Sequence, residues 1–368
     1  MFFYSCSILI PLRDLPEPRG SYIVGTEVFN WEDFSRDEWF TKDEIDSRKI
    51  VVQIWYPSET VSDSLYPYMD NASLRLEALS KQIGVPFFML KGTKKIKGNS
   101  YYKAKPILNK KFPLIIFSHG LGGTKTQNSI NIEELVSNGY IVIAPDHTYD
   151  ASLTVFEDGT TKEFQSKLDD NVTEEEFWAS RLPQINTRAG DVRFIIDKLQ
   201  ADNSLSIYKA IDFNNIGIFG HSFGGATSIV SSWNDTRISA CLNLDGWFVP
   251  VIDPIINNGL NIPFCYLGQV EWSGTPTNYT KAYDFFNNCK SDAYFIKIKD
   301  TKHFDYADLP YFSKIGKLIG LSGKAADKDL TLNLNKVILG FFNEYLKDDI
   351  TNWSSDLTDN YETIIKFK

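Results

Sequence analysis

Cysteine is scarce in this chain, with four among 368 residues. None of the four belongs to a CxxC pair or has a histidine at zinc-finger spacing, so the sequence predicts neither a metal-binding knuckle nor a thioredoxin-type redox motif. Cysteine without such a setting is among the most buried residue types, and we expect free, buried thiols. The four are Cys6, Cys241, Cys265 and Cys289.

Basic runs and long apolar segments are also missing. The chain carries 38 Lys and Arg against 47 Asp and Glu, a net charge of −9. Binding to nucleic acid depends on neutralising phosphates, so we expect no nucleic-acid partner. The apolar first ten residues are too short for a membrane span and lack the basic region of a secretory signal. The sequence therefore leaves open whether the protein is cytoplasmic or secreted with an incomplete signal.

Histidine is equally rare, which restricts any chemistry that needs an imidazole to four positions. These are His119, His147, His221 and His303.

Short apolar runs alternate with amphipathic stretches along most of the chain. The runs predict strands at 48–57, 112–118, 140–145, 215–219, 238–244, 262–267 and 293–299. The amphipathic stretches predict helices at 128–138, 185–199, 223–232, 277–288 and 332–346. Continuous apolar runs fit strands that are covered on both faces. The pattern predicts an α/β fold, a mostly parallel doubly wound sheet with helices on both faces.

Neither an internal repeat nor a flexible linker divides this alternation. We therefore expect one domain over residues 15–350, an N-terminal tail at 1–14 and a C-terminal tail at 351–368. Two insertions, near 65–107 and 148–181, interrupt the pattern. Long excursions at the carboxyl edge of such a sheet commonly form lids or substrate walls.

One serine lies in a G-x-S-x-G motif, Gly220-His221-Ser222-Phe223-Gly224, between a predicted strand and a predicted helix. A nucleophile on such a sharp turn has a strained backbone that requires small neighbours, which explains the glycines two residues before and after it. The helix that follows points its positive end at the place where an oxyanion forms. We predict that Ser222 is the nucleophile of an acyl transfer.

A serine hydroxyl needs an imidazole to accept its proton. His221 adjoins the serine, but its side chain leaves the turn in another direction, and we expect it to pack beneath the turn. His119, in a glycine-rich loop, and His147, just past a strand end, are expected to contact substrate. His303 follows the last predicted parallel strand in a loop that can close over Ser222, and the chain order serine, acid, histidine is the one this architecture uses. We therefore predict His303 as the base.

A metal site at the same loop is the rival interpretation. It would consist of His303, Asp305 and Asp308, but there is no HExxH motif and no second histidine nearby. We expect no metal and no organic cofactor.

The acid that orients the base has two candidates, each at a strand end. Asp245 ends the strand directly after the elbow helix, and Glu271 follows the next strand. We favour Asp245, because an Asp-Gly pair at the tip of a buried strand is hard to explain structurally, whereas Glu271 fits a solvated loop.

Two backbone N–H groups must bind the oxyanion. One belongs to Phe223, the residue after the nucleophile, and we assign the other to Leu121 in the glycine-rich loop. Trp247 and Phe304, close to the predicted acid and base, are expected to contact substrate.

Four motifs together resemble a known family. They are Phe-Ser-His-Gly-Leu-Gly-Gly at 117–123, Gly-His-Ser-Phe-Gly-Gly at 220–225, Leu-Asp-Gly at 244–246 and Lys-His-Phe at 302–304. With the segments at 16–26 and 52–57, they are similar to the platelet-activating-factor acetylhydrolase family, plasma and intracellular type II, of the α/β-hydrolases.

This resemblance, which covers about residues 16 to 310, implies Ser222, Asp245 and His303 as a catalytic triad and Leu121 and Phe223 as oxyanion donors. It also implies calcium-independent hydrolysis of short or oxidised sn-2 acyl chains of phospholipids.

Other functions stay open at this point. A short-chain carboxylesterase, or an esterase similar to bacterial dienelactone hydrolases or polyester-cleaving enzymes, would share the elbow and act on a small ester. A catalytically silent α/β-hydrolase used as a binding module is the alternative from another class. Residues 85–97 combine apolar side chains with Lys91, Lys94, Lys95 and Lys97, which fits contact with a lipid surface or, equally, a packed loop with solvated lysines.

Overall fold

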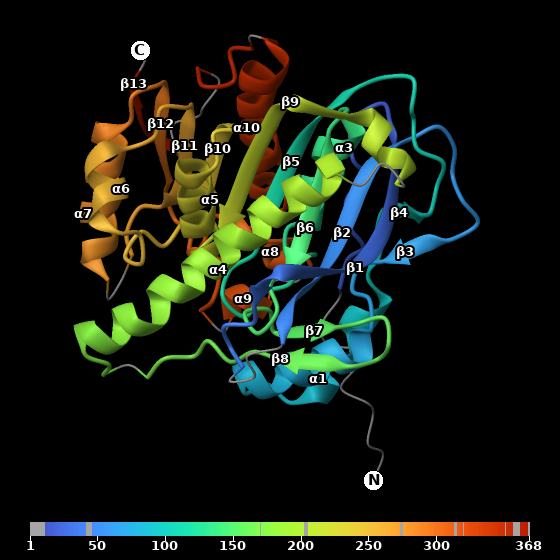
Figure 1. The fold of residues 1–368 in the computed structure, drawn as a ribbon, viewed down its shortest axis with the longest axis horizontal. Helices are drawn as coiled ribbons and strands as arrows, with labels where there is room; N and C mark the ends of the chain where they lie inside the picture. Colours follow the sequence, from blue (N-terminus) through green and yellow to red (C-terminus); the bar gives the residue numbers. More distant parts are fainter. Residues whose placement is uncertain are drawn as a thin grey trace.

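The computed structural model describes residues 12–41, 46–169, 171–201, 205–272, 275–312, 315–318, 320–349, 351–355 and 361–366. A large twisted sheet runs through its centre, with helices on both faces (Figure 1). The strands are β1 (Ile23–Asp37), β2 (Ser47–Ser58), β3 (Leu65–Pro67), β4 (Lys97–Tyr102), β5 (Phe112–Ser118), β6 (Ile141–Asp146), β7 (Leu153–Val155), β8 (Thr161–Glu163), β9 (Ile211–His221), β10 (Ile238–Leu244), β11 (Phe264–Gln269), β12 (Ala293–Ile298) and β13 (Tyr361–Lys366).

Eleven of these strands form the main sheet, in the order β13-β12-β11-β10-β9-β5-β6-β2-β1-β4-β3, and β7 and β8 form a separate hairpin. From β12 to β6 every neighbouring pair is parallel, whereas β13, β2 and β3 each pair antiparallel with the strands beside them. The predicted α/β fold with a mostly parallel sheet is confirmed.

The helices lie in two layers. They are α1 (Ala72–Ile83), α2 (Phe87–Leu90), α3 (Ser129–Ser137), α4 (Glu174–Ala201), α5 (Phe223–Asn234), α6 (Asp253–Asn258), α7 (Pro276–Asn288), α8 (Leu309–Phe312), α9 (Ile315–Leu318) and α10 (Lys328–Lys347), with 3-10 helices η2 (Lys91–Lys95), η3 (Ser206–Ala210) and η4 (His303–Tyr306). One hydrophobic core packs α4, α5, α6 and α7 against the sheet, and a second packs α3 and α10 against its other face.

The strand β5 shows how the sequence produces these two layers. All seven of its residues are buried. Leu114 and Ile116 belong to the first core, while Ile115 and Phe117 belong to the second. Because successive side chains of a strand point to opposite faces, an unbroken apolar run is needed wherever both faces are covered.

The predicted domain limits need two corrections. The insertion at 65–107 contributes β3 and β4 to the main sheet, so it is partly sheet rather than only an excursion. The expected C-terminal tail at 351–368 contains β13, which pairs with β12, and the buried Trp353.

Two further features were not predicted. The strand β1 pairs along most of its length with β2, and α4 begins at Glu174, inside the second predicted insertion.

At the N-terminus, the described part begins at Leu12, and Leu15 is already buried in a small core. Cys241, Cys265 and Cys289 are buried as predicted, and Cys6 lies outside the described residues. No helix among the described residues has both the length and the apolar character needed to cross a bilayer.

Candidate active site

Ser222 lies on a sharp turn between β9 and α5. Its backbone has φ 58° and ψ −121°, a region that side-chain-bearing residues rarely adopt. The flanking glycines are required by space, because a Cβ on Gly220 would lie 2.2 Å from the backbone oxygen of Gly224, and one on Gly224 would lie 1.9 Å from that of Ser118. The motif therefore forms a sharp strand-to-helix turn, the elbow, which places the half-buried Ser222 at the carboxyl edge of the sheet.

A histidine and an aspartate lie in line with this serine. His303 Nε2 is 2.9 Å from Ser222 Oγ, and His303 Nδ1 is 2.7 Å from Asp245 Oδ2. His303 begins η4, in the loop after β12, and Asp245 follows β10 with a left-handed φ of 43°. The fold thus brings together three side chains that are far apart in the sequence, in the order and geometry of a Ser-His-Asp triad.

Asp245 is fully buried and is held by more donors than the sequence suggested. Its Oδ1 accepts hydrogen bonds from Tyr266 Oη (3.1 Å), Gln269 N (3.0 Å) and Trp272 Nε1 (3.0 Å), and its Oδ2 accepts from Gln269 Nε2 (2.9 Å). Sequence reasoning missed these three supporting residues, although Gln269 and Trp272 flank the rival acid. Glu271 itself is exposed, and no hydrogen bond of the described residues joins it to His303.

The glycine loop (residues 119–123) supplies the second wall of the site. A Cβ on Gly120 would lie 3.2 Å from Cβ of Ser222, so the loop lies directly against this serine. The N–H groups of Gly120, Gly122 and Gly123 all donate within the protein. The N–H of Leu121 between them has no acceptor among the described residues, and neither has that of Phe223, at the first position of α5.

The expectation that His119 and His147 contact substrate is wrong, because both imidazoles are fully buried. His119 Nδ1 donates to the Gly120 carbonyl, 2.7 Å away, and its Nε2 accepts from the His147 N–H at 3.1 Å. His147 Nδ1 contacts Asp191 at 2.9 Å, and its Nε2 contacts Ser118 Oγ at 3.0 Å. Burial lowers the pKa of His119 well below its usual range and that of His147 to about 3.

Charged residues beneath the glycine loop hold these two histidines in place. Arg48 contacts Asp191 with both Nε (3.0 Å) and Nη2 (2.7 Å), and the same carboxylate contacts His147. Burial acts to raise the pKa of Asp191, but Arg48, the contact with His147 and Arg36 together outweigh burial and keep that pKa well below the usual range. Arg188 Nη2 donates to the carbonyl oxygen of His119 and, at 3.3 Å, to Ser118 Oγ. The two histidines are therefore part of the support of the loop.

Trp247 and Phe304 lie where a substrate could reach them. The backbone N–H of Trp247 donates to the Ser222 carbonyl at 3.0 Å. The half-buried Trp247 ring packs against Phe223 and Phe177, with ring centroids 5.8 and 5.9 Å away. The Phe304 ring is 44% exposed and lies next to His303. Their contact with substrate stays a prediction.

The residues of the rival metal site are used differently. Asp305 Oδ2 accepts from the backbone N–H groups of Lys302 and Gly323, both at 2.8 Å. Asp308 Oδ1 accepts from the N–H of Ile130 at 3.2 Å. No group of three potential metal ligands occurs among the residues that the structure describes.

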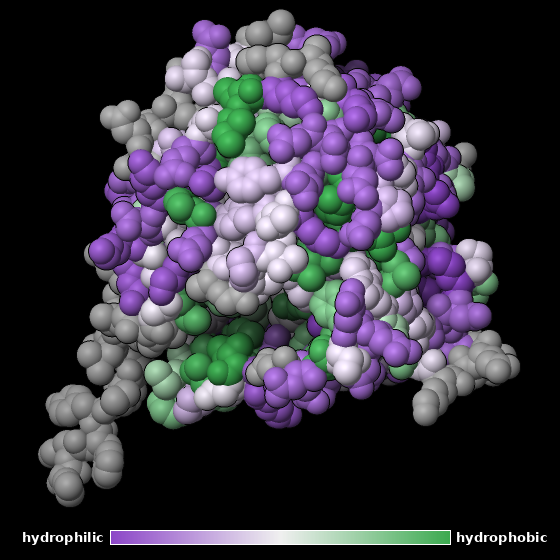
Figure 2. Space-filling view, turned by 90° about the vertical axis from the view of Figure 1, so that its left-hand side faces the viewer, coloured by the Kyte–Doolittle hydropathy of each residue, from purple (hydrophilic) through white to green (hydrophobic). Residues whose placement is uncertain are grey.

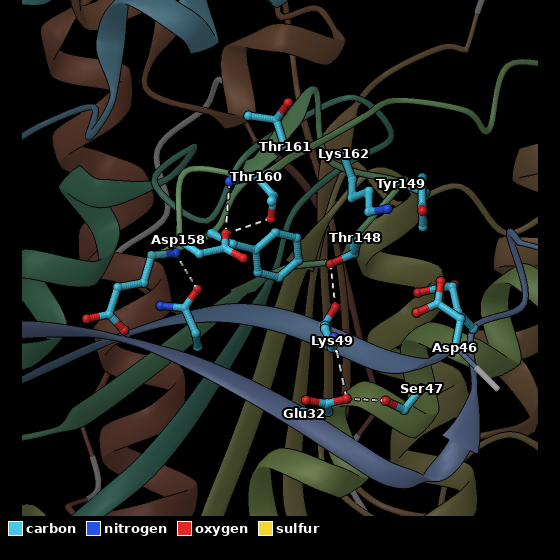
Figure 3. A pocket seen from close by; sticks show the side chains of 14 residues that line it. Glu32, Asp46, Ser47, Lys49, Thr148, Tyr149, Asp158, Thr160, Thr161 and Lys162 are labelled. Carbon is cyan, nitrogen blue, oxygen red and sulfur yellow. Dashed lines mark hydrogen bonds and ion pairs between the residues drawn. The ribbon is translucent and has the colours of Figure 1, made fainter.

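A separate pocket of about 830 Å³ lies between the β7–β8 hairpin and strands β1 and β2. Ser222, Asp245 and His303 do not line it. Figure 3 shows that two of its carboxylates have partners: Glu32 contacts Lys49 at 3.5 Å and also Ser47, and Asp158 accepts from Thr160. This pocket is therefore separate from the site around Ser222.

Taken together, the fold and the elbow define the class of this protein as an α/β-hydrolase. The sequence matches the family described as "Platelet-activating factor acetylhydrolase, isoform II" over residues 10–364. The chain belongs to this family of ester hydrolases, and the predicted resemblance is confirmed.

Individual relatives agree with this membership, and a solved structure shares the fold. Platelet-activating factor acetylhydrolase of Canis lupus familiaris is 28% identical, covering 93% of this chain and 80% of that protein. The Cavia porcellus protein of that name is 26% identical, covering 85% of this chain and 77% of its own. A ferulic acid esterase from Streptomyces cinnamoneus has the same fold, with a TM-score of 0.80 at 24% identity over 96% of this chain and 99% of that one.

Proposed function

We propose that the protein is a serine ester hydrolase in which Ser222, His303 and Asp245 form the catalytic triad. The observation that carries this proposal is the continuous line of contacts from Asp245 Oδ2 through His303 to Ser222 Oγ, at 2.7 and 2.9 Å. A nucleophile within hydrogen-bond reach of a base that is itself oriented by a third group is the arrangement needed for covalent acyl transfer.

In the proposed reaction, Ser222 Oγ attacks the ester carbonyl carbon while His303 Nε2 takes the hydroxyl proton. The N–H groups of Leu121 and Phe223 stabilise the negative charge that develops on the carbonyl oxygen. The ester C–O bond then breaks, and His303 gives its proton to the departing alcohol. Water, deprotonated by His303, releases the acyl group from Ser222.

The other three imidazoles are poorly suited to be the base. Burial lowers the pKa of His147 and of His221 to about 3 and that of His119 well below its usual range. A base with such a low pKa accepts a proton poorly near neutral pH. The geometry and the low pKa of the other three imidazoles therefore both favour His303 as the base.

For the substrate, we infer a phospholipid with a short or oxidised sn-2 acyl chain, hydrolysed without calcium. Membership of the acetylhydrolase family supports this inference. So does a relative in Arthroderma benhamiae that is named a probable 1-alkyl-2-acetylglycerophosphocholine esterase and is 26% identical over 63% of this chain and 58% of its own length.

Residues 85–97 supply a surface suited to such a substrate. Phe88 and Met89 of α2 are 62% and 42% exposed. Exposed lysines follow them, two of which, Lys91 and Lys94, lie 5.5 and 5.2 Å from the Phe87 ring centroid. Apolar and basic side chains side by side favour the boundary between lipid headgroups and acyl chains. We propose that this segment contacts the lipid surface.

Figure 1 places α1 and the β7–β8 hairpin at the lower end of the molecule. On the face drawn in Figure 2, a hollow opens in the lower half, with hydrophobic surface along its border.

The test of the catalytic assignment is Ser222→Ala, assayed with p-nitrophenyl acetate and with a fluorophosphonate probe. We expect hydrolysis and labelling both to disappear while the circular dichroism spectrum stays unchanged. Ser239→Ala, a half-buried serine on β10, is the matched control and should keep full activity. Retention of most activity in Ser222→Ala would refute the proposal, and a folded wild-type protein that never labels would favour the silent binding module.

Substrate class is tested separately on the wild-type protein. Turnover is compared on a short-acyl phosphocholine, on simple short-chain esters and on a polyester film. We expect the phosphocholine to be preferred, and a clear preference for simple esters would contradict the phospholipid assignment.

A further inference from the structure

A line of hydrogen bonds connects the glycine loop to the loop that carries His303. The Gly120 N–H donates to Gln127 Oε1 at 3.2 Å, Gln127 Nε2 lies 2.7 Å from His221 Nδ1, and His221 Nε2 lies 2.9 Å from the carbonyl oxygen of His303. Gln127 and His221 therefore join two segments that the proposed reaction uses.

The partners at both ends fix the direction of every bond. A backbone N–H can only donate, so Gln127 must present its oxygen to Gly120 and its amide N–H to His221. A carbonyl oxygen can only accept, so His221 must carry its proton on Nε2, facing His303. His221 Nδ1 is then the acceptor for Gln127. One orientation of the Gln127 amide and one tautomer of the His221 imidazole thus satisfy the whole line of bonds, from the Gly120 N–H to the His303 carbonyl.

The surroundings of Gln127 hold the His303 loop in a second way. The backbone carbonyl oxygen of Gln127 accepts from the backbone N–H of Asp308 at 3.1 Å, and Asn128 Nδ2 donates to the backbone carbonyl oxygen of Tyr306 at 2.8 Å. The segment before α3 is thus attached to the loop after β12 at three points, counting the path through His221.

His221 is suited to hold the His303 loop in place without itself gaining or losing a proton. It is 3% exposed, and its ring centroid lies 4.6 Å from that of His303. Burial, with the neighbouring His303, lowers its pKa to about 3, and His303 and Asp245 are the titratable groups that act on it. At neutral pH the ring stays uncharged and can keep the tautomer that the two bonds require.

We propose that Gln127 is a positioning residue of the reaction, which acts through His221 to hold the His303 loop and the glycine loop in register with Ser222. The proposal rests on the proposed function, because it assigns the role of base to His303 and of oxyanion donor to Leu121. Neither G-x-S-x-G nor the glycine loop motif includes Gln127, so the two sequence motifs do not reveal this connection.

Two substitutions separate this role from simple packing. Gln127→Glu keeps the acceptor for Gly120 but removes the donor to His221 Nδ1, so an imidazole that stays neutral must move its proton to Nδ1 and turn an unprotonated Nε2 toward the His303 carbonyl. Gln127→Met keeps the approximate volume and removes both bonds. We expect kcat on p-nitrophenyl acetate to fall about 10- to 100-fold in each, since a buried polar group loses its partner, with KM changed less than about threefold because substrate contacts are untouched.

Acidification provides a readout that a packing defect would not show. When the carboxylate introduced by Gln127→Glu becomes protonated, its hydroxyl can again donate to His221 Nδ1. The ratio of variant to wild-type kcat should therefore rise as the pH falls toward about 4, whereas the ratio for Gln127→Met should stay constant. Gln200→Glu, the same chemical change on the exposed end of α4, is the matched control and should behave as wild type throughout.

The tautomer of His221 can also be measured directly. With only four histidines in the chain, each ring can be assigned by long-range ¹H–¹⁵N correlation of ¹⁵N-histidine-labelled protein. We expect the Nε2–H form of His221 in the wild type and the Nδ1–H form in Gln127→Glu at pH 7. An Nδ1–H form in the wild type, or kcat within twofold of wild type in both variants, would overturn the proposal. This measurement does not depend on activity, so a failure here is distinct from residual hydrolysis by Ser222→Ala, which would refute the proposed function itself.

Discussion

The surroundings of Asp245 make Asp245→Asn an informative change. Three donors, from Tyr266, Gln269 and Trp272, converge on Oδ1. An asparagine must place its carbonyl oxygen there, because its NH₂ group cannot accept those bonds. The NH₂ group then faces His303 Nδ1 and donates a hydrogen bond to it. Nδ1 can accept this bond only when it carries no proton.

The consequence is a change of tautomer at the base. His303 would carry its proton on Nε2, facing Ser222 Oγ, and could not accept the serine proton. The same substitution in a trypsin-type triad lowers kcat about 10⁴-fold while leaving the geometry intact. We expect a loss of that order in this protein, equivalent to about 5.5 kcal/mol of transition-state stabilisation, because the three donors leave the amide no alternative orientation.

The assay is the steady-state hydrolysis of p-nitrophenyl acetate, with circular dichroism as the check on folding. Glu271→Gln is the control, since Glu271 is exposed, and we expect it to keep wild-type kcat. If Asp245→Asn kept more than about a tenth of wild-type kcat, or if only Glu271→Gln were inactive, the assignment of the acid would be wrong.

Three further predictions concern the support of the site and its surface. His147→Gln should lower the free energy of unfolding near pH 7. In urea titrations, the difference in free energy of unfolding between variant and wild type should shrink by about 1.4 kcal/mol for each pH unit below 6.5, because the wild-type imidazole stays neutral in the folded state down to about pH 3 and is protonated when unfolded. A difference that does not change with pH would contradict this prediction. Gly224→Ala places a Cβ 1.9 Å from the Ser118 carbonyl oxygen and should lower the free energy of unfolding by about 3 kcal/mol, with loss of activity; a wild-type melting temperature would show that the turn can relax. Phe88→Asp should lower the affinity for phosphatidylcholine vesicles, measured by co-sedimentation, about tenfold or more, while hydrolysis of p-nitrophenyl acetate is unchanged. Vesicle binding equal to that of wild type would exclude α2 from the lipid contact.

The elements around the elbow could be predicted from sequence because their signals are local. The apolar run of β5 requires cover on both faces, and the glycines beside Ser222 are required by distances within one turn. The choice of Asp245 over Glu271 also followed from a local signal, an Asp-Gly pair at the end of a buried strand.

What could not be predicted depends on contacts between distant segments. The burial of His119 and His147 arises from Asp191 and Arg188 on α4, and a strand-end histidine looks the same in sequence whether such partners lie beneath it or not. The helix predicted at 185–199 begins in the structure at Glu174, and Pro183 lies well inside it, although proline normally marks the first turn of a helix.

The unequal exposure of the four histidines has a practical consequence for chemical modification. The side chain of His303 is 27% exposed, whereas His119, His147 and His221 are at most 3% exposed. A reagent that acylates neutral imidazoles, such as diethyl pyrocarbonate, should therefore modify the folded protein at a single histidine. Counting modified imidazoles against remaining hydrolysis would give the concentration of competent sites in a preparation, and occupation of Ser222 by a tight competitive inhibitor should protect that one histidine from the reagent.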